Sequence, residues 1–225
     1  MNQGLVLLKL MLETRQINKG FIMKVGFYQK EQSNTHFLVA KHLDYISCEE
    51  QKSLFFLIED YLAFRKKAAF FLERNFKDIC TKKCYESSLS ACCQKEGIVI
   101  FFADFVINAL FSKKEDINKL ICLLDIESKG NKCIYLGEDG CMWALKPIVC
   151  EMFLCNQAQK KVFESDYKIK EEWNELKKCQ KLFTWPDRPV LFDELEDYFI
   201  KAGFFSPLMY MHNSPGLLRL KKRWA

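Results

Sequence analysis

The stretch "SCEEQKSLFFLIEDYLAFRKKAAFFLERNFKDI", which runs from Ser47 to Ile79, decides the fold class. Ser47 followed by Glu50 has the spacing of a capping box, so a helix is predicted to begin at Cys48. Roughly thirty residues of helical spacing predict one long helix or two shorter ones, ending where the cysteines begin. The apolar positions that carry this spacing are Leu54, Leu57, Ile58, Tyr61, Leu62, Ala68, Ala69, Leu72, Phe76 and Ile79.

Helical signals continue along the rest of the chain. Ser112 followed by Glu115 gives a second capping box, which predicts a helix running to about Leu124. Pro147 suits the first position of a helix over "PIVCEMFLCNQAQKKVF". Two more helices are expected over "DYKIKEEWNELKKCQKLF" and "VLFDELEDYFIKAG", the second of them ending at Gly203.

Two segments have ambiguous patterns. The stretch "IVIFFADFVINALF" is almost entirely apolar, so a buried strand and a buried helix both fit it. Residues 1 to about 45 have no clear periodicity, although "GFIMKVGFYQ" could form a short strand. We therefore expect a mainly α fold, with helices around an irregular cysteine-rich metal-binding centre and at most short strands. One domain is predicted over residues 1–225, with a cysteine core at about 80–155 and a helical C-terminal extension at 156–225.

The composition excludes several classes of protein. A chain of 225 residues with 49% hydrophobic content can bury a core without disulfides. The formal charge of +5 is spread along the chain and does not favour nucleic acid, and the basic C-terminal tail is expected to be a solvated terminus. No secretory signal, membrane span, phosphate-binding loop or serine-hydrolase motif is evident. We expect a cytoplasmic protein, whose reducing surroundings disfavour structural disulfides.

Eight of the eleven cysteines fall into two dense groups. The first group has the pattern C-x3-C-x7-C-C, and the second has C-x7-C-x8-C-x4-C. Both lie in segments predicted to be loops, turns or helix starts, where side chains can converge on a metal. The other three lie in predicted helices, and Cys122 and Cys179 are expected to be small buried apolar residues. The two groups are Cys80, Cys84, Cys92 and Cys93, followed by Cys133, Cys141, Cys150 and Cys155.

All-sulfur ligation suits zinc or an iron–sulfur cluster and does not suit magnesium or calcium. Cys150 is predicted in the first turn of a helix, where the dipole favours a thiolate, and Gly140 allows a tight turn before Cys141. The adjacent side chains of Cys92 and Cys93 diverge, so they either serve different metals or include one ligand and one neighbour. Two four-thiolate sites, one cluster with spare thiols, and a metal-free thiol redox protein all remain open.

The two cysteine patterns resemble the signatures of the YkgJ-like cysteine-cluster family, described as zinc- or iron-chelating domains. "CTKKCYESSLSACC" is similar to the C-x3-C…CC signature, with a longer gap before the vicinal pair. In "CIYLGEDGCMWALKPIVCEMF", Trp143 and Lys146 stand where the family usually has Tyr and Arg. Cys155 lies outside the usual pattern and is an additional candidate.

The resemblance implies a bound metal or cluster and no defined reaction. We expect an iron–sulfur cluster, most simply [4Fe–4S], with a redox or metal-dependent role and a protein redox partner. The alternative is a zinc-chelating structural or interaction module without catalysis, so whether the protein is an enzyme stays open. No motif surrounds His36, His42 or His212, and none of them is expected to be a ligand.

Overall fold

The computed structural model describes residues 26–87, 89–90, 92–94, 99–127, 130–184 and 189–210. The described chain is mainly helical, as predicted, and no described helix has both the length and the apolar character to cross a membrane. Its strands form one short antiparallel pair. The elements are α2 (Phe27–Tyr45), α3 (Cys48–Leu57), α4 (Glu59–Phe76), η2 (Lys77–Tyr85), α5 (Phe102–Phe111), α6 (Lys114–Leu124), β1 (Leu136–Gly137), β2 (Gly140–Cys141), α7 (Ile148–Glu151), α8 (Asn156–Phe163), α9 (Tyr167–Thr184) and α10 (Leu191–Lys201).

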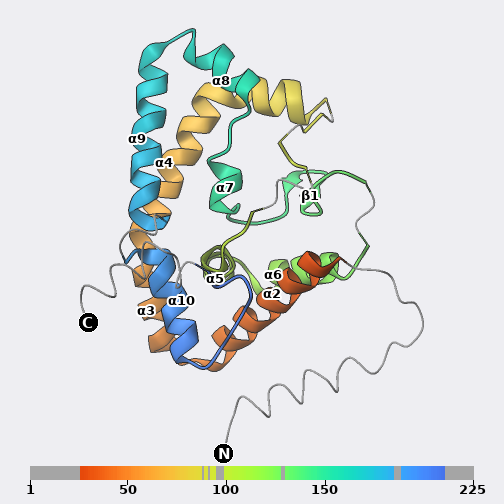
Figure 1. The fold of residues 1–225 in the computed structure, drawn as a ribbon, viewed down its shortest axis with the longest axis vertical. Helices are drawn as coiled ribbons and strands as arrows, with labels where there is room; N and C mark the ends of the chain where they lie inside the picture. Colours follow the sequence, from red (N-terminus) through yellow and green to blue (C-terminus); the bar gives the residue numbers. More distant parts are fainter. Residues whose placement is uncertain are drawn as a thin grey trace, which may run out of the picture.

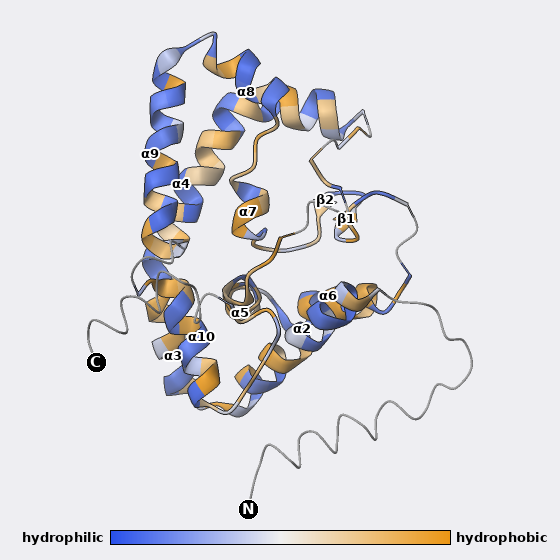
Figure 2. Cartoon of the chain, in the orientation of Figure 1, coloured by the Kyte–Doolittle hydropathy of each residue, from blue (hydrophilic) through white to orange (hydrophobic). Residues whose placement is uncertain are grey.

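Helix α5 lies at the centre of the helical assembly (Figure 1). It contacts α2 and α10, while α2 also packs along α6, and α10 also contacts α9. Helices α4 and α9 run side by side at the edge of the fold, and Figure 2 shows that the surface of α9 is largely hydrophilic. One hydrophobic core joins these helices and extends beneath the segment that contains β1, β2 and α7.

The opening of the Ser47–Ile79 stretch folds as its pattern predicts. Ser47 Oγ accepts the Glu50 N–H at 3.1 Å, and Glu50 Oε2 accepts the Ser47 N–H at 3.0 Å, so the capping box is complete. The periodic stretch forms two helices, α3 and α4, with a break at Ile58. The last residues of the stretch belong to η2, a π-helix that continues α4 directly.

The second predicted capping box is wrong, although the helix it announced is present. Helix α6 begins at Lys114 without a side-chain cap. Ser112 ends α5 instead, and its hydroxyl donates to Asn108 Oδ1 at 3.1 Å. The ambiguous apolar stretch forms α5, which is buried on nearly all sides from Phe102 to Asn108, and a helix buried in this way has no polar face to reveal its period.

Two further expectations need correction. The predicted single helix beginning at Pro147 is two helices, because α7 ends at Glu151 and α8 begins only at Asn156. The short strand expected in "GFIMKVGFYQ" is wrong for its described part, since α2 begins at Phe27. The last predicted helix is confirmed as α10, and Gly203 follows it with a φ of 86°, a left-handed conformation that suits glycine.

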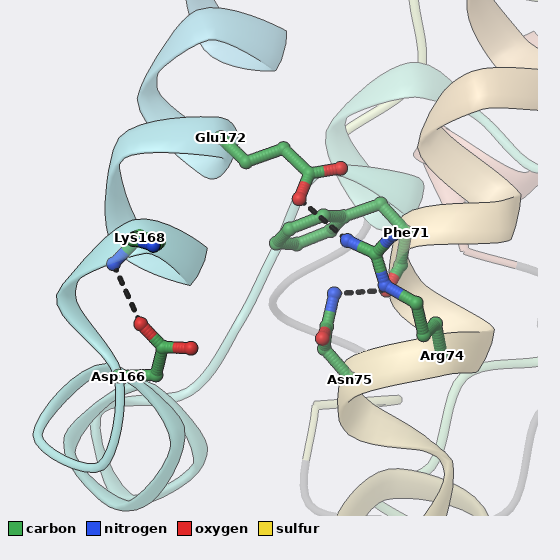
Figure 3. Close-up of polar contacts among 6 residues, drawn as sticks. All are labelled: Phe71, Arg74, Asn75, Asp166, Lys168 and Glu172. Atoms are coloured by element: carbon green, nitrogen blue, oxygen red, sulfur yellow. Dashed lines mark hydrogen bonds and ion pairs between the residues drawn. The ribbon is translucent and has the colours of Figure 1, made fainter.

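Helices α4 and α9 pack against each other beside the cysteine region. Trp173 of α9 stacks on Phe71 of α4, with 5.5 Å between ring centroids. Nearby, Arg74 pairs with Glu172 at 2.5 Å, and Asp166 accepts the Lys168 N–H at 2.8 Å at the start of α9 (Figure 3). The exposed Arg74–Glu172 pair contributes little, since such pairs are worth about 1 kcal/mol or less. Aromatic packing therefore holds α9 against α4.

Candidate metal centre

Cys80 and Cys84 lie on the π-helix η2 and not in the loop predicted for them. The π-helix has i→i+5 hydrogen bonds, so its turns are wider than α turns and residues four apart stay near one face. Cys80 packs against the hydrophobic core. The carrier of the first cysteine group is therefore a continuation of α4.

A hydrogen-bonded turn leads from Cys84 to the vicinal pair. The carbonyl of Cys84 accepts the Ser90 N–H at 3.0 Å, and the carbonyl of Ser90 accepts the Cys93 N–H at 3.0 Å. Ser90 has a φ of 37°, an uncommon value for a residue with a side chain. The turn brings Cys92 and Cys93 back towards η2.

The two cysteine groups meet through their backbones. The carbonyl of Cys93 accepts the Cys133 N–H at 3.0 Å, and an antiparallel bridge pairs Gln94 with Lys132. The Tyr85 hydroxyl donates to the carbonyl of Gly137 at 3.2 Å, which ties η2 to the β1–β2 hairpin. These contacts place Cys93 and Cys133 side by side, although they are forty residues apart.

The β1–β2 hairpin carries Cys141 of the second group. Leu136 pairs with Cys141 and Gly137 with Gly140. Gly140 has a φ of 108°, so the tight turn expected before Cys141 is present and requires glycine. The hairpin thus returns the chain from Cys133 to Cys141, and both of these cysteines pack partly buried against the core.

An aromatic layer lies beneath the hairpin. Trp143 is buried and contacts Tyr135 and Phe105, with ring centroids 5.4 and 5.2 Å apart. His36 is only 1% exposed and packs on Phe105 and Trp143, and burial lowers its pKa to about 3. Within the described residues, neither His36 ring nitrogen has a hydrogen-bond partner.

Three buried side chains hold the segment between Cys141 and Cys150. Asn108 Oδ1 accepts the Leu145 N–H at 3.0 Å, and Asp104 Oδ1 accepts the Ile148 N–H at 3.0 Å. The third contact is made by Arg65, which donates to the carbonyl of Lys146 at 2.6 Å. Sequence reasoning missed all three, and the one available signal was a carboxylate, Asp104, inside the most apolar stretch.

Several thiols of the two groups have raised pKa values. Burial raises the pKa of Cys80 to about 11 and that of Cys150 to about 12, and the neighbouring thiols raise both further. Burial also raises the pKa values of Cys133 and Cys141. The expectation that a helix dipole favours the Cys150 thiolate is therefore wrong, because α7 has only four residues and burial dominates.

The vicinal thiols differ from each other. A side-chain hydrogen bond between them raises the pKa of Cys92 and lowers that of Cys93. The charges that act on Cys93 come from Cys133, Cys141 and Cys150. Cys92, Cys155 and Cys84 act on Cys80, and Cys92 also acts on Cys150, so the electrostatic influence of the thiols runs between the two groups.

Lys146 is a cation that acts on thiols of both cysteine groups. Its charge lowers the pKa of Cys80 and Cys92 in the first group and of Cys141 in the second. In each case this effect is smaller than that of burial. The Lys146 ammonium also lies 3.7 Å from the carboxylate of Glu151.

The thiols are chemically suitable ligands for a sulfur-bound metal, but their side chains do not converge on one point. All the cysteines are reduced thiols. Among the residues that the structure describes, no three His, Cys, Asp or Glu side chains form a group that could hold a metal ion. Loading a metal would require several thiols to rotate and to lose their protons.

Three cysteines lie outside the two groups. Cys48, Cys122 and Cys179 are exposed, so the expectation that Cys122 and Cys179 are buried core residues is wrong. Of the histidines, His42 hydrogen-bonds Tyr198 at 3.1 Å, while His212 lies outside the described residues.

No protein-family model, curated protein or solved structure matches the chain. The resemblance to the YkgJ-like family therefore stays a prediction that rests on the cysteine patterns.

Proposed function

We propose that the chain binds a sulfur-ligated metal centre where its two cysteine groups meet. The observation that carries the proposal is the backbone hydrogen bond from Cys133 to Cys93, which joins two thiol-rich loops from distant parts of the sequence. Thiol-rich loops that converge in a reducing compartment are typical of zinc and iron–sulfur sites. The proposal includes membership of the YkgJ-like family and a cytoplasmic location.

The first-choice ligands are Cys93, Cys133, Cys141 and Cys150. They come from three adjoining segments, and each of the last three raises the pKa of Cys93, as nearby thiolates do. Binding a metal removes that mutual repulsion, because the cation neutralises the thiolates. Cys80, Cys84, Cys92 and Cys155 are then either a second set or spare thiols.

An iron–sulfur cluster, most simply [4Fe–4S], is the centre we propose first. Such a cluster supplies one-electron redox chemistry when bound, and its potential depends on burial and on hydrogen bonds to sulfur. The chain's own part would be to hold the thiolates and keep water from one side. Trp143, Tyr135 and Phe105 form the aromatic layer suited to that task. A protein redox partner would exchange the electron.

Zinc is the second candidate, without catalysis. The number of clustered thiols allows it, because a structural zinc ion takes four thiolates in a tetrahedron and eight thiols could hold two ions. In this reading the vicinal cysteines serve different ions, so the side-chain hydrogen bond between Cys92 and Cys93 would break when the metals bind. The metal would then cross-link the β1–β2 hairpin and η2 and hold them against the helical core.

Anaerobic purification followed by absorption spectroscopy and elemental analysis tests these alternatives. An iron–sulfur centre gives a broad visible absorption with iron and acid-labile sulfide in the protein. Stoichiometric zinc without iron would rule out the cluster and support the zinc module. A chain that takes up neither metal after reconstitution, yet loses titratable thiols in mild oxidant, would be a thiol redox protein.

A further inference from the structure

Three buried polar side chains converge on the four-residue segment Leu145–Ile148, which follows Cys141 and precedes Cys150. Arg65, Asp104 and Asn108 are each at most 4% exposed. Each makes a hydrogen bond to the backbone of the segment: Arg65 to the Lys146 carbonyl, Asp104 to the Ile148 N–H and Asn108 to the Leu145 N–H. We call these three residues the clamp.

The segment needs such partners because it leads into the start of α7. The hydrogen bonds of α7 satisfy the carbonyls of Pro147 and Ile148, whereas the N–H groups of Leu145 and Ile148 and the carbonyl of Lys146 are bonded by side chains of the clamp. Apolar packing alone would leave the buried Ile148 N–H unpaired, at a cost of about 1–3 kcal/mol. The clamp therefore selects one backbone path between the two cysteines.

The clamp also joins the carriers of the two cysteine groups. Arg65 belongs to α4, which continues directly into η2 and its Cys80 and Cys84. Its guanidinium additionally donates to the Tyr61 hydroxyl at 3.0 Å, so its position is fixed from within α4. Asp104 and Asn108 come from the central helix α5, which bears no cysteine.

We infer that Arg65, Asp104 and Asn108 are positioning residues that set where Cys150 lies relative to Cys141 and to the first cysteine group. The inference deepens the proposed function and rests on it for its metal readout. None of the three contacts the metal in this role. They fix the backbone that carries a ligand, as residues behind metal ligands commonly do.

The test compares cobalt(II) affinity of the full chain and its variants by competition with a chelator. Asn108→Ala and Asp104→Ala are expected to bind cobalt about 10- to 100-fold more weakly. Their sulfur-to-cobalt charge-transfer band should also weaken, because fewer thiolates reach the ion. Asp104→Asn retains an oxygen for the Ile148 N–H, so it should recover much of the affinity.

Thr35→Val is the matched control, because it removes a buried hydrogen bond of 2.8 Å to Ser206 that does not involve the clamp. It should lower stability without changing the cobalt spectrum. Far-ultraviolet circular dichroism checks that every variant keeps its helices. Clamp variants that bind cobalt as tightly as this control would overturn the inference.

A metal-free measurement separates failure of the inference from failure of the proposed function. A short reagent that bridges two thiols is applied to the chelator-treated chain, and the linked peptides are mapped. Clamp variants should lose links between Cys150 and the other groups while retaining the Cys93–Cys133 link. If the native chain binds no cobalt, the proposed function fails, but this loss still supports the clamp. An unchanged link pattern in the variants overturns it.

Discussion

The Asp104 carboxylate accepts the Ile148 N–H at 3.0 Å through one oxygen and the Phe101 N–H at 3.0 Å through the other. One buried side chain therefore caps α5 and also holds the residue that begins α7. This connection transmits any change at Asp104 to the backbone two residues before Cys150. It also places an ionisable carboxyl group in the core, so the stability of the fold should depend on pH.

Stability should depend on pH through Asp104. Burial raises its pKa from 3.8 to about 6, so the folded chain favours the protonated carboxyl. The resulting stabilisation is complete below about pH 4 and is lost as the pH rises through about 6, an effect of about 3 kcal/mol. Urea unfolding of the metal-free native chain, relative to Asp104→Asn, should show this loss between about pH 4 and pH 7.

Other titrating groups contribute equally to both chains and cancel in that comparison. Arg65 is the cation whose charge opposes the rise in the pKa of Asp104. A difference between the two chains that does not vary with pH would contradict the prediction.

His36 should act in the opposite sense. Burial lowers its pKa from 6.5 to about 3, so the neutral ring is favoured in the folded chain. Its stabilisation is present above about pH 6.5 and is lost at about 1.4 kcal/mol per pH unit as the pH falls towards 3. His36→Leu removes this loss, and at neutral pH it should be at least as stable, because two unpartnered ring nitrogens are removed.

Chemical denaturation of the native chain and His36→Leu at several pH values measures this difference. Equal slopes against pH in the two chains would show that His36 can be protonated in the folded state.

Replacement of cysteines tests the ligand assignment. Cys133→Ser, Cys141→Ser and Cys150→Ser are each expected to abolish metal binding at their site and to lower the melting temperature of the loaded protein, because metal binding and folding are coupled. Cys122→Ser and Cys179→Ser remove exposed thiols and serve as controls. Elemental analysis gives the outcome directly, and undiminished metal in the first set would refute the assignment.

Lys146→Met should shift metal uptake to higher pH. The Lys146 charge lowers the pKa of Cys80, Cys92 and Cys141, so its removal makes these thiols harder to deprotonate. Zinc binding measured against pH should therefore show a later midpoint, with affinity at high pH little changed. Lys119→Met is the matched control, since Lys119 pairs with Asp116 on the exposed surface of α6. Identical pH midpoints of zinc binding in Lys146→Met and Lys119→Met would exclude a specific effect of the Lys146 charge.

Local sequence patterns predict the helices well where local contacts decide the outcome. The box at Ser47 and Glu50 forms because both residues are exposed and free to bond each other. The same pattern at Ser112 fails, because the Ser112 hydroxyl is taken by Asn108 of the preceding helix. The segment after Pro147 also breaks early, and Cys155 becomes the residue before α8 rather than a residue within a helix.

The candidate centre was predictable only in its residue types. Cysteine spacing places thiols in two groups, and the Cys93–Cys133 bond brings those groups together. The clamp could not be predicted, because Arg65 and Lys146 are eighty-one residues apart and only the packed core brings them together. The raised thiol pKa values likewise arise from burial, which cysteine spacing does not encode.

The π-helix η2 allows the positions of Cys80 and Cys84 to be adjusted. It continues α4 without interruption, yet each of its turns holds more backbone than an α turn. Converting one such turn to α geometry would change the angular position of Cys84 relative to Arg65 while leaving α4 intact. Cys80 and Cys84 thus lie on a helix whose turns contain extra backbone. Ligand binding at these cysteines can tighten those turns without unfolding the core.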